Sequence, residues 1–355
     1  MITDPITFPI ERVSHTRVSE QDFSQVEFGR VFSDHMLVAD FEEGEWRDPK
    51  IVPYGNISLS PATSALHYGQ AVFEGMKAYK GQNDETLLFR PYDNYRRLNQ
   101  SAQRMCMPEV SEEIFMQGLM QLLRVDADWV PSTPGCSLYI RPFMFASNQF
   151  IGVRPSTRYR FIIFTCPVAA YYSNPLRVKV ETQYVRSAEG AAGYAKAAGN
   201  YGSSLYPAHL AQKEGYHQLL WTDAKEHKYI EESGTMNVMF VIDGKLITPA
   251  LSTSILAGIT RDSVLQVARD QGVPVEERRI SVDEIIQAHQ AGTLQAAFGT
   301  GTAATITQIA SIGYEGQDFD LPPVEQREIS NSIGDTLDQI KTGQAPDPHN
   351  WVVKV

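Results

Sequence analysis

The chain has 355 residues, of which 43% are hydrophobic and 21% are charged, and this is enough apolar material for two domains with cores of their own. Its formal net charge of -11 argues against nucleic acid as a partner. No apolar stretch is long enough to span a bilayer, and the first residues, Met1-Ile-Thr-Asp-Pro-Ile, lack the basic and apolar regions of a signal peptide. We therefore expect no membrane partner and residence in the cytoplasm.

The first half of the chain mixes strands with helices. Apolar residues at helical spacing predict a helix from Ser111 to Val125, and the run from 161 to 168 predicts a strand that ends this half. Turn residues then precede an alternating strand that begins at Val178. Further on, Ser281-Val-Asp-Glu predicts a capping box at the start of a helix that Gly292 ends. These patterns predict a first domain over 1–170, a connection over 171–182 and a second domain over 183–355.

A single lysine, Lys196, lies among small residues from Ala191 to Ser204, just ahead of a predicted helix. Small side chains let the backbone approach a ligand closely, and a neutral amine there can reach a carbonyl. Taken alone, the segment is better explained as a flexible glycine-rich loop with a solvated lysine. The segments that follow change this balance.

Two adjacent carboxylates precede a predicted hairpin. Asp243-Gly244 lies between two β-rich runs, which is a strong hairpin signal and places Glu231 and Glu232 where a buried strand begins. An inward-facing carboxylate at this place would suit a heteroaromatic nitrogen that must stay protonated. Both charges of such a pair are more often solvated turn charges.

Two further segments predict anion-binding turns. Small residues at Gly258-Ile259-Thr260 precede a helix that Gly272 ends, and free N–H groups at its start suit a phosphate, although ordinary capped helices are more numerous. The second turn, Gly299-Thr-Gly-Thr302, also matches the glycine spacing of a dinucleotide-binding fingerprint. That fold needs a helix straight after the glycines, whereas 302–312 is rich in Thr and Ile and predicts extended chain. Donation of N–H and hydroxyl groups to a small anion is the better interpretation.

A nucleophilic lysine, a candidate buried carboxylate and two anion-binding turns together describe a pyridoxal phosphate site. The chain resembles the fold type IV pyridoxal phosphate enzymes, and within them the branched-chain amino acid aminotransferases of the eukaryotic and related bacterial type. The resemblance runs from about Phe28 to the C-terminal region. It is carried by His67-Tyr68, Phe73-Glu-Gly-Met-Lys-Ala-Tyr, Phe89-Arg-Pro with Asn94 and Arg97, Leu138-Tyr-Ile-Arg-Pro, Lys196 through Gly202, Glu232-Ser-Gly-Thr-Met-Asn and Phe298-Gly-Thr-Gly-Thr-Ala.

The resemblance implies an α/β (α+β) fold with a small α/β domain, a larger pseudo-barrel domain that binds the cofactor, and the cofactor between them. It also implies a homodimer in which the partner helps to close each site. The cofactor is pyridoxal 5'-phosphate, and no metal is expected.

The resemblance also assigns cofactor-binding residues. Lys196 is implied to bind the cofactor covalently and to move the proton of the substrate's Cα. Glu232, and not Glu231, is implied to pair with the pyridine nitrogen, and Tyr201 to lie near the phenolic oxygen. Arg97 matches the family's phosphate arginine, which makes Arg96 a surface charge. The remaining phosphate donors implied are Ile259, Thr260 and Thr302.

A transaminase of this kind must accept an aliphatic side chain and the charged side chain of glutamate in one pocket. The substrates implied are branched-chain L-amino acids, their 2-oxo acids, glutamate and 2-oxoglutarate. Arg141 is the candidate for the distal carboxylate of glutamate and 2-oxoglutarate. The pocket wall is implied to contain aromatic rings with hydroxyl tips and small residues. Its members are Phe28, Tyr68, Tyr139, Tyr171, Thr235 and Ala303.

The cysteines depart from one subfamily pattern. Mammalian members carry a Cys-x-x-Cys pair just after the glycine turn, where this chain has Ala304-Thr-Ile-Thr, which excludes a thiol switch there. Cys106, Cys136 and Cys166 are widely spaced in predicted helix or strand. They predict buried reduced thiols and neither a disulfide framework nor a metal site.

Three other functions compete with this interpretation. D-amino acid transamination and aminodeoxychorismate lyase chemistry would use the same Lys196 and Glu232 with a different pocket, and Tyr139-Ile-Arg141 favours the branched-chain activity. A binding protein without catalysis would have no need of Lys196, Tyr201 and Arg97 together. The sequence does not distinguish leucine, isoleucine and valine as the preferred substrate.

Overall fold

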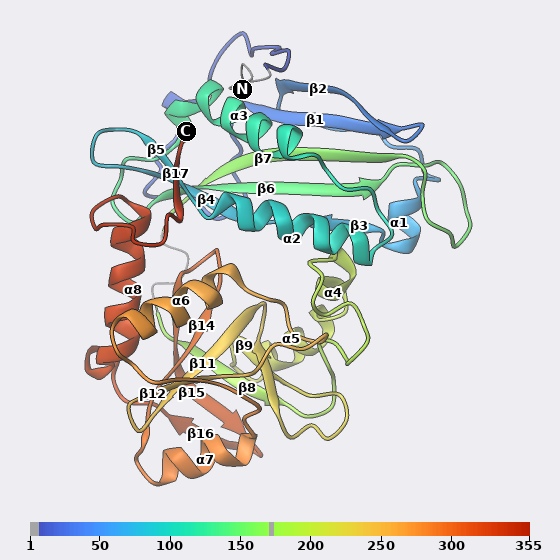
Figure 1. Ribbon diagram of the computed structural model, residues 1–355. Coiled ribbons are helices and arrows are strands. Elements are labelled where there is room, and N and C mark those ends of the chain that lie inside the picture. The colour runs from blue at the N-terminus through green and yellow to red at the C-terminus, as the bar shows by residue number, and fades with distance from the viewer. Residues whose placement is uncertain (1–6, 170–173) are drawn as a thin grey trace. The chain divides into compact units, whose positions relative to one another are not determined.

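The computed structural model describes residues 7–169 and 174–355 and divides into two compact units (Figure 1). The first unit contains the chain up to Tyr171 together with 195–199 and 340–355, and the second contains 172–194 and 200–339. Two segments from the expected second domain thus belong to the first unit, which contains more of the chain although it was expected to be the smaller. The expected connection over 171–182 contains a strand of the second unit, Leu176–Glu181.

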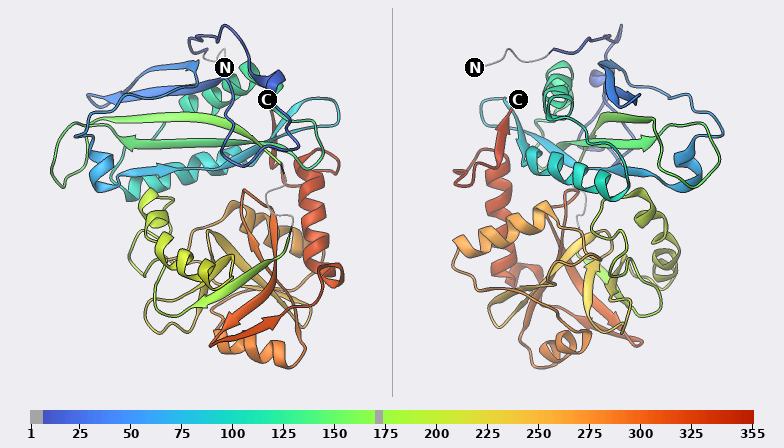
Figure 2. Two further views of the ribbon diagram at one scale, coloured as in Figure 1. Left: turned by 180° about the vertical axis from the view of Figure 1, so that it is seen from behind. Right: turned by 45° about the vertical axis from the view of Figure 1, so that its right-hand side comes forward.

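The first unit is an antiparallel sheet with two helices packed on one face (Figures 1 and 2). Its strands are β1 (His35–Glu42), β2 (Glu45–Pro53), β3 (Ala71–Phe73), β4 (Met76–Lys80), β5 (Thr86–Phe89), β6 (Ser137–Ala146), β7 (Tyr159–Val168) and β17 (Val352–Lys354). Its helices are α1 (Ser64–Tyr68), α2 (Pro91–Arg104) and α3 (Gly118–Val125), with short 3-10 turns at Val18–Glu20 and Ala127–Trp129. The strand order is β17-β5-β4-β6-β7-β1-β2, and β3 pairs with β6.

The core of this unit lies between the sheet and helices α2 and α3. Leu98 of α2 and Leu119 of α3 are fully buried there with Leu37 of β1 and Phe161 of β7. Burial of such a side chain contributes about 1.5–3 kcal/mol, which is why the amphipathic pattern fixes these helices on the sheet. The helix predicted from 111 to 125 is confirmed, with a π-helical turn at Glu113–Gln117 ahead of α3.

The second unit contains the predicted pseudo-barrel. Its strands are β8 (Leu176–Glu181), β9 (Gln218–Thr222), β10 (Ile230–Ser233), β11 (Met236–Ile242), β12 (Lys245–Thr248), β13 (Val275–Glu277), β14 (Leu294–Thr300), β15 (Ile306–Tyr314) and β16 (Gln317–Asp320). Within the described residues, six strands follow the order β10-β9-β8-β15-β14-β11, and pairing of β10 with β11 closes the ring. Strands β12, β13 and β16 extend it at its margins.

Helices surround the strands of the second unit. They are α5 (Leu205–Lys213), α6 (Ile259–Asp270) and α7 (Val282–Gln290), with a 3-10 turn at Val324–Gln326. Two further helices contain residues of both units: α4 (Ala198–Gly202) begins with residues of the first unit, and α8 (Glu328–Lys341) ends with residues of the first unit. Apolar residues of α7, such as Ile285, join Val238 and Phe240 of β11 in one core. Figures 1 and 2 show α7 at one end of the strands.

Several local predictions are confirmed in the second unit. Asp243 and Gly244 have φ of 49° and 73° and join β11 to β12, as a two-residue hairpin turn with two positive φ angles requires. The Ser281 hydroxyl accepts the backbone N–H of Glu284 and begins α7. The extended chain expected from 302 begins at Ile306, because the preceding residues belong to the turn that leaves β14.

The three cysteines are free thiols in different surroundings. Cys166 is buried in β7, and this burial raises the pKa of its thiol to about 11. Cys136 is partly buried. Cys106 is exposed, contrary to the expectation, because it lies in a turn after α2 with a φ of 53° and not in a helix or strand.

Within 7–169 and 174–355, the structure contains no helix of the length and apolar character needed to cross a membrane.

Candidate active site

The lysine segment is fixed to the first unit by backbone hydrogen bonds. The carbonyl of Lys196 accepts the N–H of Phe73 at 3.0 Å, and the N–H of Lys196 donates to the Ser101 hydroxyl at 2.9 Å. The small neighbours Ala195 and Ala197 are buried. Small side chains are therefore needed for close packing between β3 and α2, and the segment is an anchored element of the first unit, not a flexible loop.

A buried carboxylate, Glu74, lies close to this lysine. Arg97 donates to it twice, from Nε to Oε1 at 2.7 Å and from Nη2 to Oε2 at 2.8 Å, and the Asn94 amide donates to Oε2 at 2.7 Å. Burial opposes ionisation of Glu74. The charges of Arg97 and Lys196 and the hydrogen bonds overcome that effect and hold the pKa of the carboxyl below its usual value. The Glu74 side chain is therefore an anion inside the first unit.

Glu74 is not among the site residues predicted from the sequence. The sequence feature that could have indicated a buried carboxylate is the position of this glutamate between apolar neighbours in Phe73-Glu-Gly, since a buried charge needs a partner. Arg97 is that partner, and its assignment to a phosphate stays a prediction. Arg96 is a surface charge as expected, with a side chain 71% exposed and paired with Asp93.

Two predicted residues of the first unit, Lys196 and Arg141, contact the ring of Phe73, and two more, Tyr139 and Phe28, adjoin Arg141 in turn. The Lys196 Nζ lies 4.8 Å and the Arg141 Cζ 4.7 Å from the centroid of this ring. Arg141 donates from Nη2 to the Tyr139 hydroxyl at 3.0 Å, and the Phe28 ring packs edge-on against Tyr139 at 5.1 Å. The candidate nucleophile and the candidate arginine thus share one aromatic surface.

Gly75 makes room for this arrangement. A Cβ at residue 75 would overlap with the Tyr139 hydroxyl, so only glycine lets β4 lie this close to the tyrosine. The Phe73-Glu-Gly motif therefore supplies a ring for two cations, a buried anion and the space for a tyrosine.

Arg141 has no anionic partner among the described residues of the first unit. Among the described residues no carboxylate lies within 4.0 Å of its guanidinium, and its buried Nε has no hydrogen-bond partner. The contacts that hold it are the faces of Phe73 and Tyr139 and the tyrosine hydroxyl. An arginine fixed in this way retains fork geometry for a carboxylate.

Another predicted pocket residue of the first unit, Tyr68, is not part of this cluster. Tyr68 ends α1 and is 38% exposed, and its ring contact is with His67. Tyr171 lies outside the described residues.

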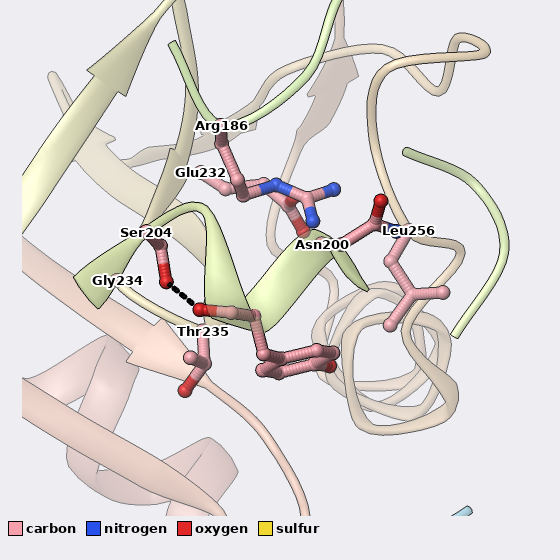
Figure 3. A pocket seen from close by; sticks show the side chains of 8 residues that line it. Arg186, Asn200, Ser204, Glu232, Gly234, Thr235 and Leu256 are labelled. Carbon is pink, nitrogen blue, oxygen red and sulfur yellow. Dashed lines mark hydrogen bonds and ion pairs between the residues drawn. The ribbon is translucent and has the colours of Figure 1, made fainter. Parts of the chain in front are cut away.

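The second unit contains a pocket that includes three predicted residues (Figure 3). Glu232 is buried at its wall and forms an ion pair with Arg186, and Figure 3 shows these two side chains next to each other. Asn237 donates to the other carboxylate oxygen of Glu232 at 3.1 Å. The lining residues are Arg186, Asn200, Tyr201, Ser204, Glu232, Gly234, Thr235 and Leu256.

Glu231 points elsewhere. Its Oε1 accepts the Ser254 hydroxyl at 2.5 Å, and it does not line the pocket. Burial raises the pKa of this carboxyl, and the Ser254 hydrogen bond and the Arg186 charge offset the effect only in part. The alternation of a strand thus separates the two glutamates, and the geometry favours Glu232 as the carboxylate for a ligand.

The two predicted anion turns lie against one residue, Asn237. Helix α6 begins after Gly258, which has an extended backbone and no side-chain cap, and a Cβ at residue 258 would overlap with the Asn237 amide oxygen. In the sheet, Asn237 pairs with Thr300, the last residue of β14 and the first threonine of the glycine turn. Thr302 and Ala303 follow in that turn and are partly buried.

This donor set suits a phosphate ester. Ile259 and Thr260 are the first residues of α6 and lie at the positive end of the helix dipole, where backbone N–H groups can donate to an anion. The Thr300 hydroxyl is buried and has no hydrogen-bond partner among the described residues, so it can donate a hydrogen bond to a bound ligand.

Two polar residues of this unit, Arg186 and Asn237, are not among the site residues predicted from the sequence. Asn237 was available as the last residue of the Glu232-Ser-Gly-Thr-Met-Asn motif, whereas nothing near Arg186 in the sequence indicates a buried side chain.

Comparison with known proteins shows the family of this chain. Residues 71–312 match the model of a family described as amino-transferase class IV. The chain belongs to this family. Branched-chain-amino-acid aminotransferase 2 of Bacillus subtilis (strain 168) is 45% identical over 98% of this chain and 97% of its own length.

Solved structures of class IV aminotransferases have the same fold. The branched-chain amino acid aminotransferase of Escherichia coli superposes with a TM-score of 0.73 at 27% identity, over 90% of this chain and 98% of that one. The T.th. enzyme of the same name, complexed with N-(5'-phosphopyridoxyl)-L-glutamate, gives a TM-score of 0.70 at 25% identity, over 89% of this chain and 97% of that one. The fold type predicted from the sequence is confirmed.

Proposed function

We propose that this chain is a branched-chain amino acid aminotransferase that transfers the amino group between L-leucine, L-isoleucine or L-valine and 2-oxoglutarate. The observation that carries this proposal is the cluster around Phe73, where one ring is in contact with Lys196 and with Arg141, an arginine that has no carboxylate partner among the described residues. The aromatic faces suit an aliphatic side chain, and Arg141 suits the distal carboxylate of glutamate. Similarity to the Bacillus subtilis relative over nearly the whole chain supports the same activity.

Pyridoxal 5'-phosphate is the proposed cofactor, and the residues present fit it. The buried Thr300 hydroxyl without a partner and the uncapped start of α6 suit its phosphate, and the buried Glu232 carboxylate suits a protonated ring nitrogen. The resemblance adds Arg97 and Thr302 as phosphate donors. When bound, the cofactor supplies a protonated ring that accepts electrons from the substrate's Cα.

The side chains of this chain then have separate tasks. When the cofactor is bound, Lys196 would hold it through its carbonyl carbon and would accept and return the proton of the substrate's Cα. The Glu232 carboxylate would hold the proton at the ring nitrogen, and Tyr201, which lines the same pocket, would donate toward the phenolic oxygen of the ring. Arg141 and the Tyr139 hydroxyl orient the dicarboxylate substrate.

The two other fold type IV activities would use the same Lys196 and Glu232. Arg141 is held by the Tyr139 hydroxyl and two ring faces and has no carboxylate partner among the described residues. This leaves the guanidinium available for the distal carboxylate of a dicarboxylate substrate and favours the branched-chain activity. Assembly as a homodimer, the roles of Tyr68, Thr235 and Ala303 in the pocket and residence in the cytoplasm stay predictions from the sequence.

The visible absorbance of the cofactor-loaded protein tests the function. We expect L-leucine alone to abolish the visible band and 2-oxoglutarate to restore it. Lys196→Ala should retain the fold and some cofactor but lose this response, whereas Lys213→Ala, an exposed control on α5, should respond like the parent. A parent protein that binds the cofactor and ignores L-leucine, or a Lys196→Ala variant that turns over near the parent rate, contradicts the proposal.

A further inference from the structure

Arg186 makes three contacts within the second unit, and all three involve buried or partly buried groups. Its Nε forms an ion pair with Oε2 of Glu232, where the two side chains are 10% and 4% exposed. Its Nη2 donates to the carbonyls of Gly193 at 3.0 Å and Ser254 at 2.9 Å. The guanidinium is therefore fixed between two loops and is directed at the carboxylate.

Asn237 holds the same carboxylate from its other oxygen. Its Nδ2 donates to Oε1 of Glu232 at 3.1 Å and to the carbonyl of Leu256 at 2.8 Å. Its amide oxygen lies where a Cβ of Gly258 would be, so the asparagine packs directly against the start of α6. Each oxygen of Glu232 thus has a side-chain partner that is itself anchored to backbone carbonyls.

We propose that Arg186 and Asn237 are positioning residues that keep Glu232 ionised and aim it at the ring nitrogen of the bound cofactor. This inference rests on the proposed function. A carboxylate that is 3% exposed is costly to ionise, and an arginine, which is charged at all working pH values, favours the anion. Without that charge Glu232 takes up a proton, and a neutral carboxyl group no longer retains the proton at the ring nitrogen.

Two other described titratable groups lie beside this pair, and neither carries a permanent positive charge. Glu231 on the same strand is turned to Ser254 and is an acid, so it opposes ionisation of its neighbour. Tyr201 lines the pocket with Arg186 and Glu232, and a tyrosine is neutral at working pH. Among the described residues that line the pocket, Arg186 is the one with a permanent positive charge.

The test compares Arg186→Gln, Arg186→Lys and Asn237→Ala in protein loaded with pyridoxal phosphate that carries 15N at the ring nitrogen. The 15N chemical shift reports protonation of the ring without any turnover. At pH 7.5 we expect the 15N shift of a protonated ring nitrogen in the parent and in Arg186→Lys. We expect the shift of an unprotonated nitrogen in Arg186→Gln and an intermediate shift in Asn237→Ala. In turnover with L-leucine, kcat of Arg186→Gln should fall about 100-fold with little change in KM.

Arg327→Gln is the matched control. Arg327 is 3% exposed in the same unit and donates to Pro322 and Gln308, and none of these three residues lines the pocket. Its substitution should lower thermal stability and leave the 15N shift unchanged.

A protonated nitrogen and an unchanged kcat in Arg186→Gln would overturn the proposal. If Arg186→Gln does not fold, Asn237→Ala decides alone, and an unchanged 15N shift and kcat in that variant overturn the proposal for both residues. A parent protein that binds no pyridoxal phosphate refutes the proposed function instead, so the two failures are distinguishable.

Discussion

Glu74→Gln removes one negative charge from the interior of the first unit and leaves Arg97, whose side chain is 9% exposed, without a counter-charge. Charge centres about 4 Å apart attract by about 4 kcal/mol at an effective dielectric constant of about 20. Loss of one partner from a buried pair costs about 3–5 kcal/mol, in agreement with this value. For a unit of this size, the midpoint of thermal unfolding should fall by about 6–20 °C.

The effect has a defined pH dependence. The pKa of Glu74 lies below its usual value despite burial, because Arg97 and Lys196 favour the anion. The stabilisation is therefore fully present above the pKa of glutamate in the unfolded chain and is lost as the pH falls through the lower pKa of the folded state. The difference between parent and variant should be largest at neutral pH and should disappear in acid.

Thermal unfolding of cofactor-free protein, followed by circular dichroism between acid and neutral pH, measures this difference. Glu43→Gln is the control, because Glu43 lies at the same 2.7 Å from an arginine, Arg47, but is 75% exposed. A surface pair of this kind contributes less than about 1 kcal/mol. Equal losses in the two variants, or a loss in Glu74→Gln that does not depend on pH, would refute the reasoning about the buried pair.

Three other substitutions test separate parts of the structure. Arg141→Leu should weaken the binding of glutamate and 2-oxoglutarate by about 2–5 kcal/mol and leave single-turnover conversion by L-leucine unchanged, since only the dicarboxylate needs the guanidinium. Half-reaction kinetics with each substrate alone measure the two effects, and equal losses in both half-reactions would contradict this prediction. Glu231→Gln should be neutral or stabilising at neutral pH, because burial raises the pKa of this carboxyl and makes its ionised form unfavourable, and the difference should vanish in unfolding experiments below about pH 4. Ser281→Ala should lower the free energy of unfolding by about 1 kcal/mol through loss of the cap on α7, whereas an unchanged denaturation midpoint would show that the cap contributes nothing.

Local chemistry in the sequence was sufficient for several elements, whereas the candidate site residues were named from the motifs of the family that the chain resembles. The turn at Asp243-Gly244, the capping box at Ser281 and the start of α6 each depend on residues a few positions apart, so their physical causes are visible in the chain. Glu232 is distinguished from Glu231 by the family motif, and the alternation of β10 agrees with that choice. Lys196 and Arg141 were also named from motifs, and the structure places both on the ring of Phe73.

Only the tertiary structure decided which distant residues pair. Closure of the barrel by β10 and β11, the partnership of Glu74 with Arg97 and that of Arg186 with Glu232 join residues far apart in the chain. The assignment of 340–355 to the first unit likewise follows from pairing of β17 with β5. Such pairings are selected by the packing of whole elements and by the high free-energy cost of an unpaired charge in the interior. Both effects depend on contacts between residues far apart in the chain, which form only when the chain folds.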